Sequence, residues 1–294
     1  MIDVDVHTHL APIVAHRLQG LKGVEWLEET SRLSLDGLVV GMKDLFFPER
    51  LVDWLDRRGV RRALVSIPPP LYRQRLSIED ARVWVEYLNE ALLETVLRHP
   101  GRLAPLFYVP LEHPELIDPL MRVYARGEYA GIALAAGGHP DIVYSRQVYR
   151  GLWSVLDAHK SFVFVHPGTC SDPRLHPFYL ENLAGNPYET GVAASHLVMA
   201  GIPACYPGIR FCLAHAGGVF PCLCGRLEQG FLTRRPGIDT EGVEWPRQAI
   251  RRFYCDGIAH DEATLELARE MFGEDHVLFG SDWPFPMGLT DPEA

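Results

Sequence analysis

The sequence predicts an α/β protein with a (β/α)8 TIM-type barrel. Eight short runs rich in β-branched and aromatic residues follow one another along the chain, and segments with helical periodicity separate them. Strands that alternate with helices form βαβ units, whose strands lie parallel in one sheet. A doubly wound open sheet is the alternative. It usually has fewer strands and a glycine-rich phosphate loop after the first, whereas this chain has "HTHLAP" there.

The predicted strands are short and mostly apolar. They comprise residues 4–9, 63–68, 103–110, 131–137, 162–167, 209–217, 253–259 and 277–284. The first helical segment has Pro48 near its start and Gly59 at its end, which is the usual asymmetry. The second opens at Ser77, a candidate N-cap three residues before Asp80. Further helical segments cover residues 114–127, 145–160, 189–201 and 261–273.

We expect residues 1–294 to form one domain with an insertion. The stretch 11–47 is long for a connection between a strand and a helix, and it contains "RLSLDGLVV". It therefore predicts an inserted hairpin or lid after the first strand. Only ten residues follow "SDWP", and their Pro, Gly and Asp content does not suit an eighth helix. We expect either a truncated chain or a last barrel seam that is covered in another way, for example by a partner subunit.

The composition excludes several classes of partner. The formal charge of −10 and the absence of a basic cluster argue against nucleic acid. No apolar run approaches membrane-spanning length and no leader precedes His7, so we expect a cytoplasmic protein that binds no membrane. The six cysteines include no Cys-x-x-Cys pair, which argues against a thiolate zinc site.

Residues that can bind a metal ion stand at the carboxyl ends of predicted strands. His7 and His9 end the first strand and point to one face, because side chains alternate along a strand. His166 ends strand five, His215 strand six and Asp282 strand eight. In a (β/α)8 barrel these ends share one rim, where active sites lie. Four strands are therefore expected to bring His and Asp side chains to one site.

This set of residue types suits hydrolytic or proton-transfer chemistry at a metal ion. Three histidines and a carboxylate can hold a divalent ion and leave a position for water. Zn²⁺ lowers the pKa of such a water to about 7, which supplies hydroxide at neutral pH. One histidine then remains, and a free imidazole beside the water is the usual general base or acid. The residue pattern alone does not say which histidine is free.

Four motifs resemble those of a known superfamily. They are "DVHTHLAP", "FVHP", "AHAGGVFP" and "GSDWPFPMG", and they are similar to marker motifs of the amidohydrolase superfamily, especially its 2-amino-3-carboxymuconate-6-semialdehyde decarboxylase branch. The similarity covers essentially the whole chain. It implies that His7, His9, His166 and Asp282 are metal ligands and that His215 handles the proton of the metal-bound water. Strand four has no lysine to bridge two ions, so the resemblance implies one ion, zinc or alternatively manganese.

The resemblance also implies residues that bind a small carboxylate substrate. Arg226, eleven residues after His215, matches an arginine that binds a substrate carboxylate across a dimer interface, so we expect a homodimer. Phe285 matches an aromatic residue of the substrate pocket. Arg50 lies near the position of a second family arginine, about one residue out of register.

One segment departs from the branch. After the strand-five histidine the branch has Trp-Asp-Met, whereas this chain has Gly168, Thr169 and Cys170. The loss of a large aromatic side chain reshapes the pocket and leaves the substrate open. We interpret Cys170 as a packed thiol of the pocket wall. His176 and His260 could face the site, but neither receives a role.

Two enzymatic functions are consistent with these residues. The first is a metal-dependent decarboxylase of an unsaturated or aromatic carboxylic acid, in which His215 deprotonates the metal-bound water, a proton replaces CO2 on carbon, and Arg226 holds a carboxylate. The alternative is a hydrolase that uses the same hydroxide to attack a lactone, amide, ester or C–C bond, because the fold and metal site do not fix the reaction. A hydratase and a non-catalytic binding protein are further alternatives.

Overall fold

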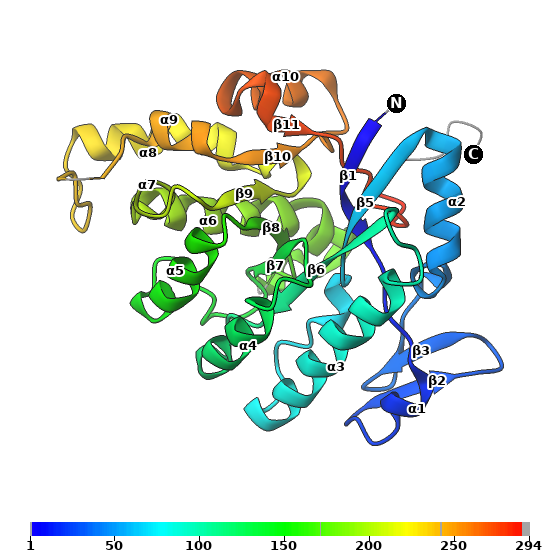
Figure 1. Cartoon of the computed structure of the whole chain (residues 1–294). Helices are drawn as coiled ribbons and strands as arrows, with labels where there is room; N and C mark the ends of the chain where they lie inside the picture. The colour runs from blue at the N-terminus through cyan, green and yellow to red at the C-terminus, as the bar shows by residue number, and fades with distance from the viewer. Residues whose placement is uncertain (1, 171, 242, 290–294) are drawn as a thin grey trace. The chain divides into compact units, whose positions relative to one another are not determined.

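The predicted barrel architecture is confirmed by the computed structural model, which describes residues 2–170, 172–241 and 243–289. Over these residues the parallel strands of the main sheet follow the order β1-β5-β6-β7-β8-β9-β10-β11, which is that of a (β/α)8 barrel (Figure 1). Their bounds are β1 Ile2–His9, β5 Val60–Ser66, β6 Leu103–Val109, β7 Gly131–Ala136, β8 Phe162–Pro167, β9 Arg210–Leu213, β10 Tyr254–Asp256 and β11 Val277–Leu278.

The chain divides into two compact units. The first comprises Met1–Val109, Gly127–Ala130 and Phe279–Ala294, and the second comprises Pro110–Arg126 and Gly131–Leu278. The first unit therefore contains both the beginning of the chain and the residues that follow the last strand.

In the first unit, β1 pairs with β5, and β5 pairs with β6, all in parallel. The segment after β11 lies on the other side of β1. The Val6 N–H donates to the Phe279 carbonyl at 2.9 Å, and Thr8 forms a parallel bridge with Trp283. The segment that follows the last strand thus runs beside the first. The helices α2 (Pro48–Arg58) and α3 (Ile78–Val96) pack against β5 and β6 respectively.

The predicted insertion is present as a small antiparallel sheet in the first unit. It contains β2 (Val24–Leu27), β3 (Arg32–Leu35) and β4 (Leu38–Val39), and the short helix α1 (Ala15–Leu18) precedes it (Figure 1). The Trp26 ring packs edge-on against Phe46 with centroids 5.4 Å apart, which attaches this hairpin to the segment leading into α2. The hairpin prediction is therefore confirmed.

In the second unit, β7 to β11 form a continuous parallel series. All six residues of β7 are buried, which explains its uninterrupted apolar sequence. Figure 1 shows α10 beside β10 and β11, in agreement with their contacts. The helices of this unit are α4 (Ile117–Tyr124), α5 (Arg150–Ala158), α6 (Asn186–Met199), α7 (Ile202–Cys205), α8 (Phe220–Leu232), α9 (Pro246–Ala249) and α10 (Glu262–Phe272). Of these, α7, α8 and α9 were not among the helices predicted from periodicity.

The last three strands of the main sheet are shorter than predicted. β9 ends at Leu213 rather than residue 217, because His215 and Ala216 have left-handed φ values of 56° and 53°. β11 ends at Leu278, although the following residues still bind β1 through their backbone. After Asp282 the chain turns back, and the Leu289 N–H donates to the Ser281 carbonyl at 2.8 Å. The predicted absence of an eighth helix also concerns residues 290–294, which lie outside the described residues.

The helix ends follow the signals seen in the sequence. The Ser77 hydroxyl accepts the Asp80 N–H at 3.2 Å and caps α3, while Gly59 ends α2 in the left-handed conformation, with φ of 64°. Over the described residues, no helix combines the length and apolar character needed to cross a bilayer.

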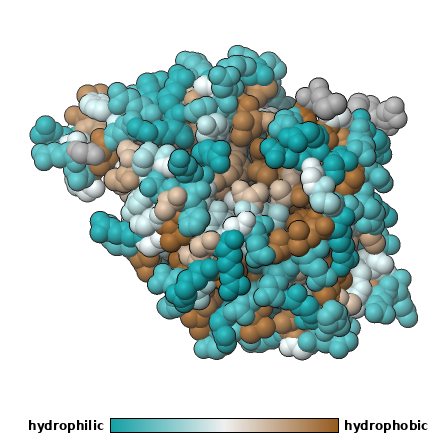
Figure 2. Space-filling model, viewed as in Figure 1, coloured by the Kyte–Doolittle hydropathy of each residue, from teal (hydrophilic) through white to brown (hydrophobic). Residues whose placement is uncertain are grey.

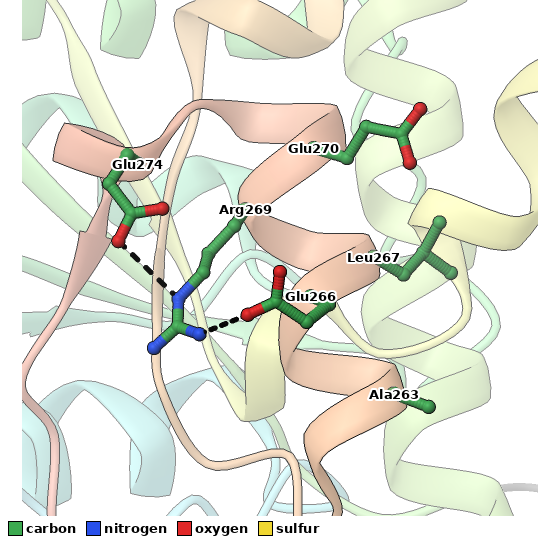
Figure 3. A pocket seen from close by; sticks show the side chains of 6 residues that line it. All are labelled: Ala263, Glu266, Leu267, Arg269, Glu270 and Glu274. Carbon is green, nitrogen blue, oxygen red and sulfur yellow. Dashed lines mark hydrogen bonds and ion pairs between the residues drawn. The ribbon is translucent and has the colours of Figure 1, made fainter.

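Hydrophilic residues predominate on the face shown in Figure 2, and the hydrophobic ones lie in smaller patches between them. On α10, for example, Arg269 lies between Glu266 and Glu274 and forms ion pairs with both (Figure 3). Exposed pairs of this kind contribute little to stability.

Candidate metal centre

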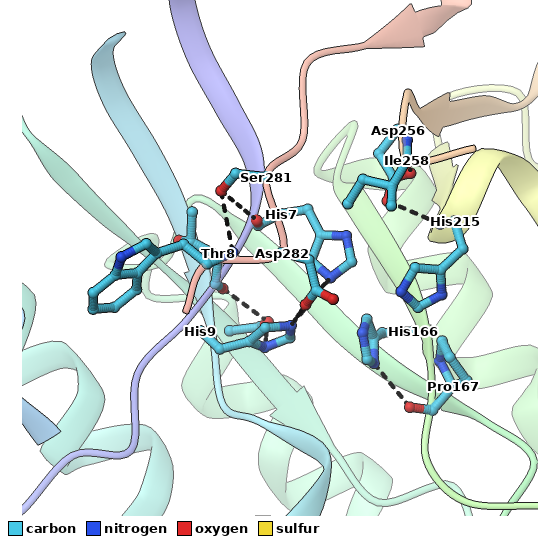
Figure 4. Close-up of polar contacts among 12 residues, drawn as sticks. His7, Thr8, His9, His166, Pro167, His215, Asp256, Ile258, Ser281 and Asp282 are labelled. Carbon is cyan, nitrogen blue, oxygen red and sulfur yellow. Dashed lines mark hydrogen bonds and ion pairs between the residues drawn. The ribbon is translucent and has the colours of Figure 1, made fainter. Parts of the chain in front are cut away.

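Three potential metal ligands converge in the first unit. His7 and His9, at the carboxyl end of β1, are fully buried, and their Nε2 atoms lie 3.1 Å apart. The Asp282 Oδ1 atom lies 3.2 Å from each of these nitrogens (Figure 4). The two histidines face one side because side chains alternate along the strand. The site thus brings two imidazole nitrogens and a carboxylate oxygen together where they are buried from solvent. This donor set suits a divalent cation.

The backbone around these residues is held by a buried aspartate. The Asp5 carboxylate accepts N–H groups from His7 at 3.0 Å and from Ser281 at 3.1 Å. The Asp282 N–H donates to the His7 carbonyl at 2.8 Å, and the His9 N–H to the Trp283 carbonyl at 2.9 Å. These bonds tie β1 to the segment that follows β11 and fix how the three candidate ligand side chains leave the backbone.

The tautomer of His9 follows from its other ring nitrogen. The Ser66 hydroxyl donates to the Thr8 carbonyl at 3.3 Å and lies 3.0 Å from His9 Nδ1. Because the hydroxyl proton is used in this way, we assign Nδ1 as the N–H donor to Ser66. The Nε2 lone pair is then left to face Asp282, as a metal ligand requires.

The electrostatics of the site favour neutral imidazole. Burial lowers the pKa of His9, and its contact with the Asp282 carboxylate opposes this effect only in part. Neutral imidazole is the form that binds a metal. Burial raises the pKa of the Asp5 carboxyl to about 7, against the effect of the hydrogen bonds from Ser281 and His7.

This raised pKa gives a stability prediction for the metal-free protein. The Asp5 carboxyl has a pKa of about 7 in the fold, against an ordinary value of 3.8, so the folded state binds the proton more tightly. The contribution of this proton to the free energy of unfolding is fully present below about pH 4 and is lost as the pH rises through about 7. Asp5→Asn keeps the Oδ1 acceptor and should flatten this dependence. Urea unfolding of both chelator-treated proteins across this pH range checks it, and equal pH slopes would contradict the prediction.

Two further histidines lie together in the second unit. His166 ends β8 and is 3% exposed, and its Nδ1 lies 2.8 Å from the Pro167 carbonyl (Figure 4). A carbonyl only accepts, so Nδ1 carries the proton and Nε2 keeps a lone pair. His215 follows β9, and its ring meets that of His166 edge-on at 5.3 Å between centroids.

Comparison with known proteins places the chain in a family. The amidohydrolase family model matches residues 4–294. The chain belongs to the amidohydrolase family. The 2-amino-3-carboxymuconate-6-semialdehyde decarboxylase of Dictyostelium discoideum is 26% identical over 302 residues, which cover 99% of this chain and 84% of that protein. The resemblance predicted from the motifs is therefore confirmed.

Solved structures support the fold of this amidohydrolase. The 5-carboxyvanillate decarboxylase of Sphingomonas paucimobilis matches with a TM-score of 0.74 and 20% identity, over 96% of this chain and 89% of that one. The dihydroxybenzoic acid decarboxylase of Polaromonas sp. JS666, solved with manganese and 2-nitroresorcinol, matches with a TM-score of 0.76 and 20% identity, over 99% and 89%.

The predicted substrate residues of the amidohydrolase lie in different settings. The Phe285 ring is half-buried and meets His9 edge-on with centroids 5.3 Å apart, so it borders the candidate ligands. Arg226 is exposed on α8. Arg50 forms an ion pair with Asp44 and lies over the Phe47 ring, 4.7 Å from its centroid.

The other residues singled out in the sequence are Cys170, His176 and His260. Cys170 is buried, and burial raises the pKa of its thiol, which disfavours the reactive thiolate. His176 is exposed and pairs with Glu181 at 3.1 Å, while His260 lies exposed before α10. None of these observations gives the three residues a part in metal binding.

Sequence reasoning about this amidohydrolase missed two residues that support the candidate ligands: Asp5 and Ser66. For Asp5 a signal was available, because it stands two residues before His7, in the same spacing that separates His7 from His9. Ser66 ends β5 and could have been found only by pairing β5 with β1 in the correct register, in which it lies opposite His9.

Proposed function

We propose that this amidohydrolase is a metal-dependent carboxy-lyase that releases CO2 from a small unsaturated or aromatic carboxylic acid. The observation that carries the proposal is the buried group of His7, His9 and Asp282, whose ligand atoms lie 3.1–3.2 Å from one another. The relatives named above are decarboxylases of carboxylated unsaturated or aromatic compounds. Their names supply the reaction class, and the donor set of this chain supplies its chemical means.

We propose that His7, His9, His166 and Asp282 hold one divalent ion, zinc or manganese. All four are buried and offer a nitrogen or carboxylate oxygen as a potential ligand atom. The Nδ1 atoms of His9 and His166 have hydrogen-bond partners, which leaves Nε2 of each as the ligand atom. Such an ion would supply a Lewis acid beside the substrate.

His215 is proposed to move the proton. Decarboxylation breaks the bond between a substrate carbon and its carboxylate, and the electron pair left on that carbon takes up a proton as CO2 leaves. An imidazole can deliver this proton and recover it from water, because it titrates near neutrality. Phe285 beside His9 would exclude water from one side of the substrate ring or chain. Arg226 is proposed to hold a carboxylate in the neighbouring subunit of a homodimer.

The hydrolase remains the second candidate, because Gly168, Thr169 and Cys170 stand where the decarboxylase branch has Trp-Asp-Met, with its large aromatic side chain. A smaller wall admits a bulkier or bent substrate, such as a lactone or amide. In that reaction His215 would take a proton from the attacking water and pass it to the leaving group.

Metal analysis combined with a CO2-release assay tests the proposal. We expect about one equivalent of zinc or manganese per chain, CO2 from at least one acid in a panel of unsaturated and aromatic carboxylates, loss of activity after chelation, and recovery when the ion is returned. The chelated protein serves as the control for spontaneous decarboxylation. One equivalent of metal without CO2 from any acid would overturn the lyase and direct the assay to lactones and amides.

A further inference from the structure

The turn that carries His215 has an unusual backbone. After β9, four successive residues have positive φ: 56° at His215, 53° at Ala216, 80° at Gly217 and 59° at Gly218. Glycine adopts such angles readily, but residues with a side chain do so only when the surrounding structure holds them. The direction of the His215 side chain therefore depends on whatever fixes this turn.

Asp256 contacts this turn directly. It ends β10, and its side chain is completely buried. Its Oδ2 accepts the His215 N–H at 3.0 Å (Figure 4). Its Oδ1 accepts the N–H groups of Ala216 at 3.1 Å and Ile258 at 3.0 Å. One carboxylate thus binds both left-handed non-glycine residues and the end of its own strand.

The rest of the turn leaves little room for another arrangement. The N–H groups of Gly217 and Gly218 donate to the carbonyls of Ala214 and His215 at 3.1 and 2.8 Å. A β-carbon on Gly217 would approach the Phe272 ring to 2.6 Å, and one on Gly218 would approach the Pro187 carbonyl oxygen to 2.3 Å. The glycines hold the far half of the turn, and Asp256 holds the half that carries the imidazole.

We propose that Asp256 is a positioning residue for proton transfer: its carboxylate holds the left-handed turn that aims the His215 imidazole at the substrate. The inference rests on the proposed role of His215. A carboxylate suits this task because its two oxygens can accept several N–H groups at once, and charge strengthens these bonds. In Asp256→Asn, one oxygen becomes an NH2 group, which cannot accept an N–H. The turn then loses at least one of its anchors.

Kinetics of Asp256→Asn on the acid that gives CO2 provide the first test. Displacement of a catalytic group by about 1 Å can cost about 10²-fold in rate, so we expect kcat to fall by about that factor while KM and metal content stay near the wild-type values. Asp157→Asn is the matched control, because Asp157 also accepts a backbone N–H, from Gly208 at 2.6 Å, but lies at the end of α5. An equal effect in both variants would reduce Asp256 to a structural role.

A double variant separates positioning from general stability. If Asp256 acts through His215, the variant carrying both His215→Ala and Asp256→Asn should be no slower than His215→Ala alone. Ala216→Gly should restore part of the kcat lost in Asp256→Asn, because glycine adopts the left-handed angle without hydrogen bonds to the Asp256 carboxylate. Additive losses, or no recovery with glycine, would overturn the inference. If Asp256→Asn does not fold alone, the variant that also carries Ala216→Gly takes its place and is compared with Ala216→Gly alone.

A crystal structure of Asp256→Asn supplies a readout that does not depend on activity. We expect His215 and Ala216 to leave the left-handed region or the imidazole to change direction. An unchanged turn would overturn the inference even if wild-type activity is confirmed. If the turn changes but the wild-type protein releases no CO2 from any acid, the result would support the role of Asp256 in holding the turn and reject the proposed reaction.

Discussion

Replacement of His215 by alanine should lower kcat for CO2 release by about 10²–10⁴-fold, because general acid–base catalysis contributes about this much. The metal content should stay near one equivalent, since His215 is not among the proposed ligands. The overall fold should persist, because the variant keeps the backbone N–H that Asp256 accepts. Steady-state CO2 release and metal analysis of the same preparation measure both quantities.

His176→Ala is the control for this prediction. It makes the same substitution at an exposed histidine that pairs with Glu181, and it should leave kcat unchanged. The outcome that would reverse the assignment is also defined. Metal loss in His215→Ala, together with retained metal and lost turnover in His166→Ala, would mean that the two neighbouring histidines exchange the roles of ligand and proton carrier.

Replacement of Asp282 by asparagine should remove the metal and, with it, turnover. Asp282 brings the negative charge of the proposed ligand set to the point where the Nε2 atoms of His7 and His9 meet. Loss of a hydrogen-bond partner of a ligand commonly costs about 10–100-fold in metal affinity, so loss of a charged ligand should cost more. Metal-binding titrations of the chelated protein measure the affinity.

Asp80→Asn is the matched control, because Asp80 is a partly exposed carboxylate that pairs with Lys22 at the surface, away from the proposed ligands. Its metal affinity and kcat should equal those of the wild type. If Asp282→Asn binds the ion as tightly as the wild type does, Asp282 is not a ligand. The group at β1 would then have to be reinterpreted as a hydrogen-bonded cluster.

Much of the fold was predictable because its signals are local. Apolar runs such as that of β7 form strands that are buried on both faces, and Ser77 and Gly59 mark helix ends through hydrogen bonds to nearby backbone. The hairpin β2–β3 was predicted from the length and composition of its segment. In contrast, the helices α7, α8 and α9 were missed. The strands β9, β10 and β11 were predicted too long, because their ends depend on tertiary contacts.

The candidate ligands could be predicted from the sequence, but the residues that hold them in place could not. His7, His9, His166, His215 and Asp282 could be identified from their places at strand ends, together with the family motifs. Ser66 could not, because its role depends on the register of β5 against β1. Asp256 could not either, because it acts on the backbone of a turn 40 residues away.

The sequence by itself determined the order of the strands, most of the longer helices and the candidate ligand side chains, because periodicity and side-chain chemistry are properties of neighbouring residues. Tertiary structure decided how those side chains are aimed. Asp5 binds Ser281 across 276 positions of the chain, and Asp256 holds His215 and Ala216 in left-handed conformations that neither residue prefers alone. Such conformations are stable only when distant buried acceptors bind their N–H groups, and those partners are chosen by the fold.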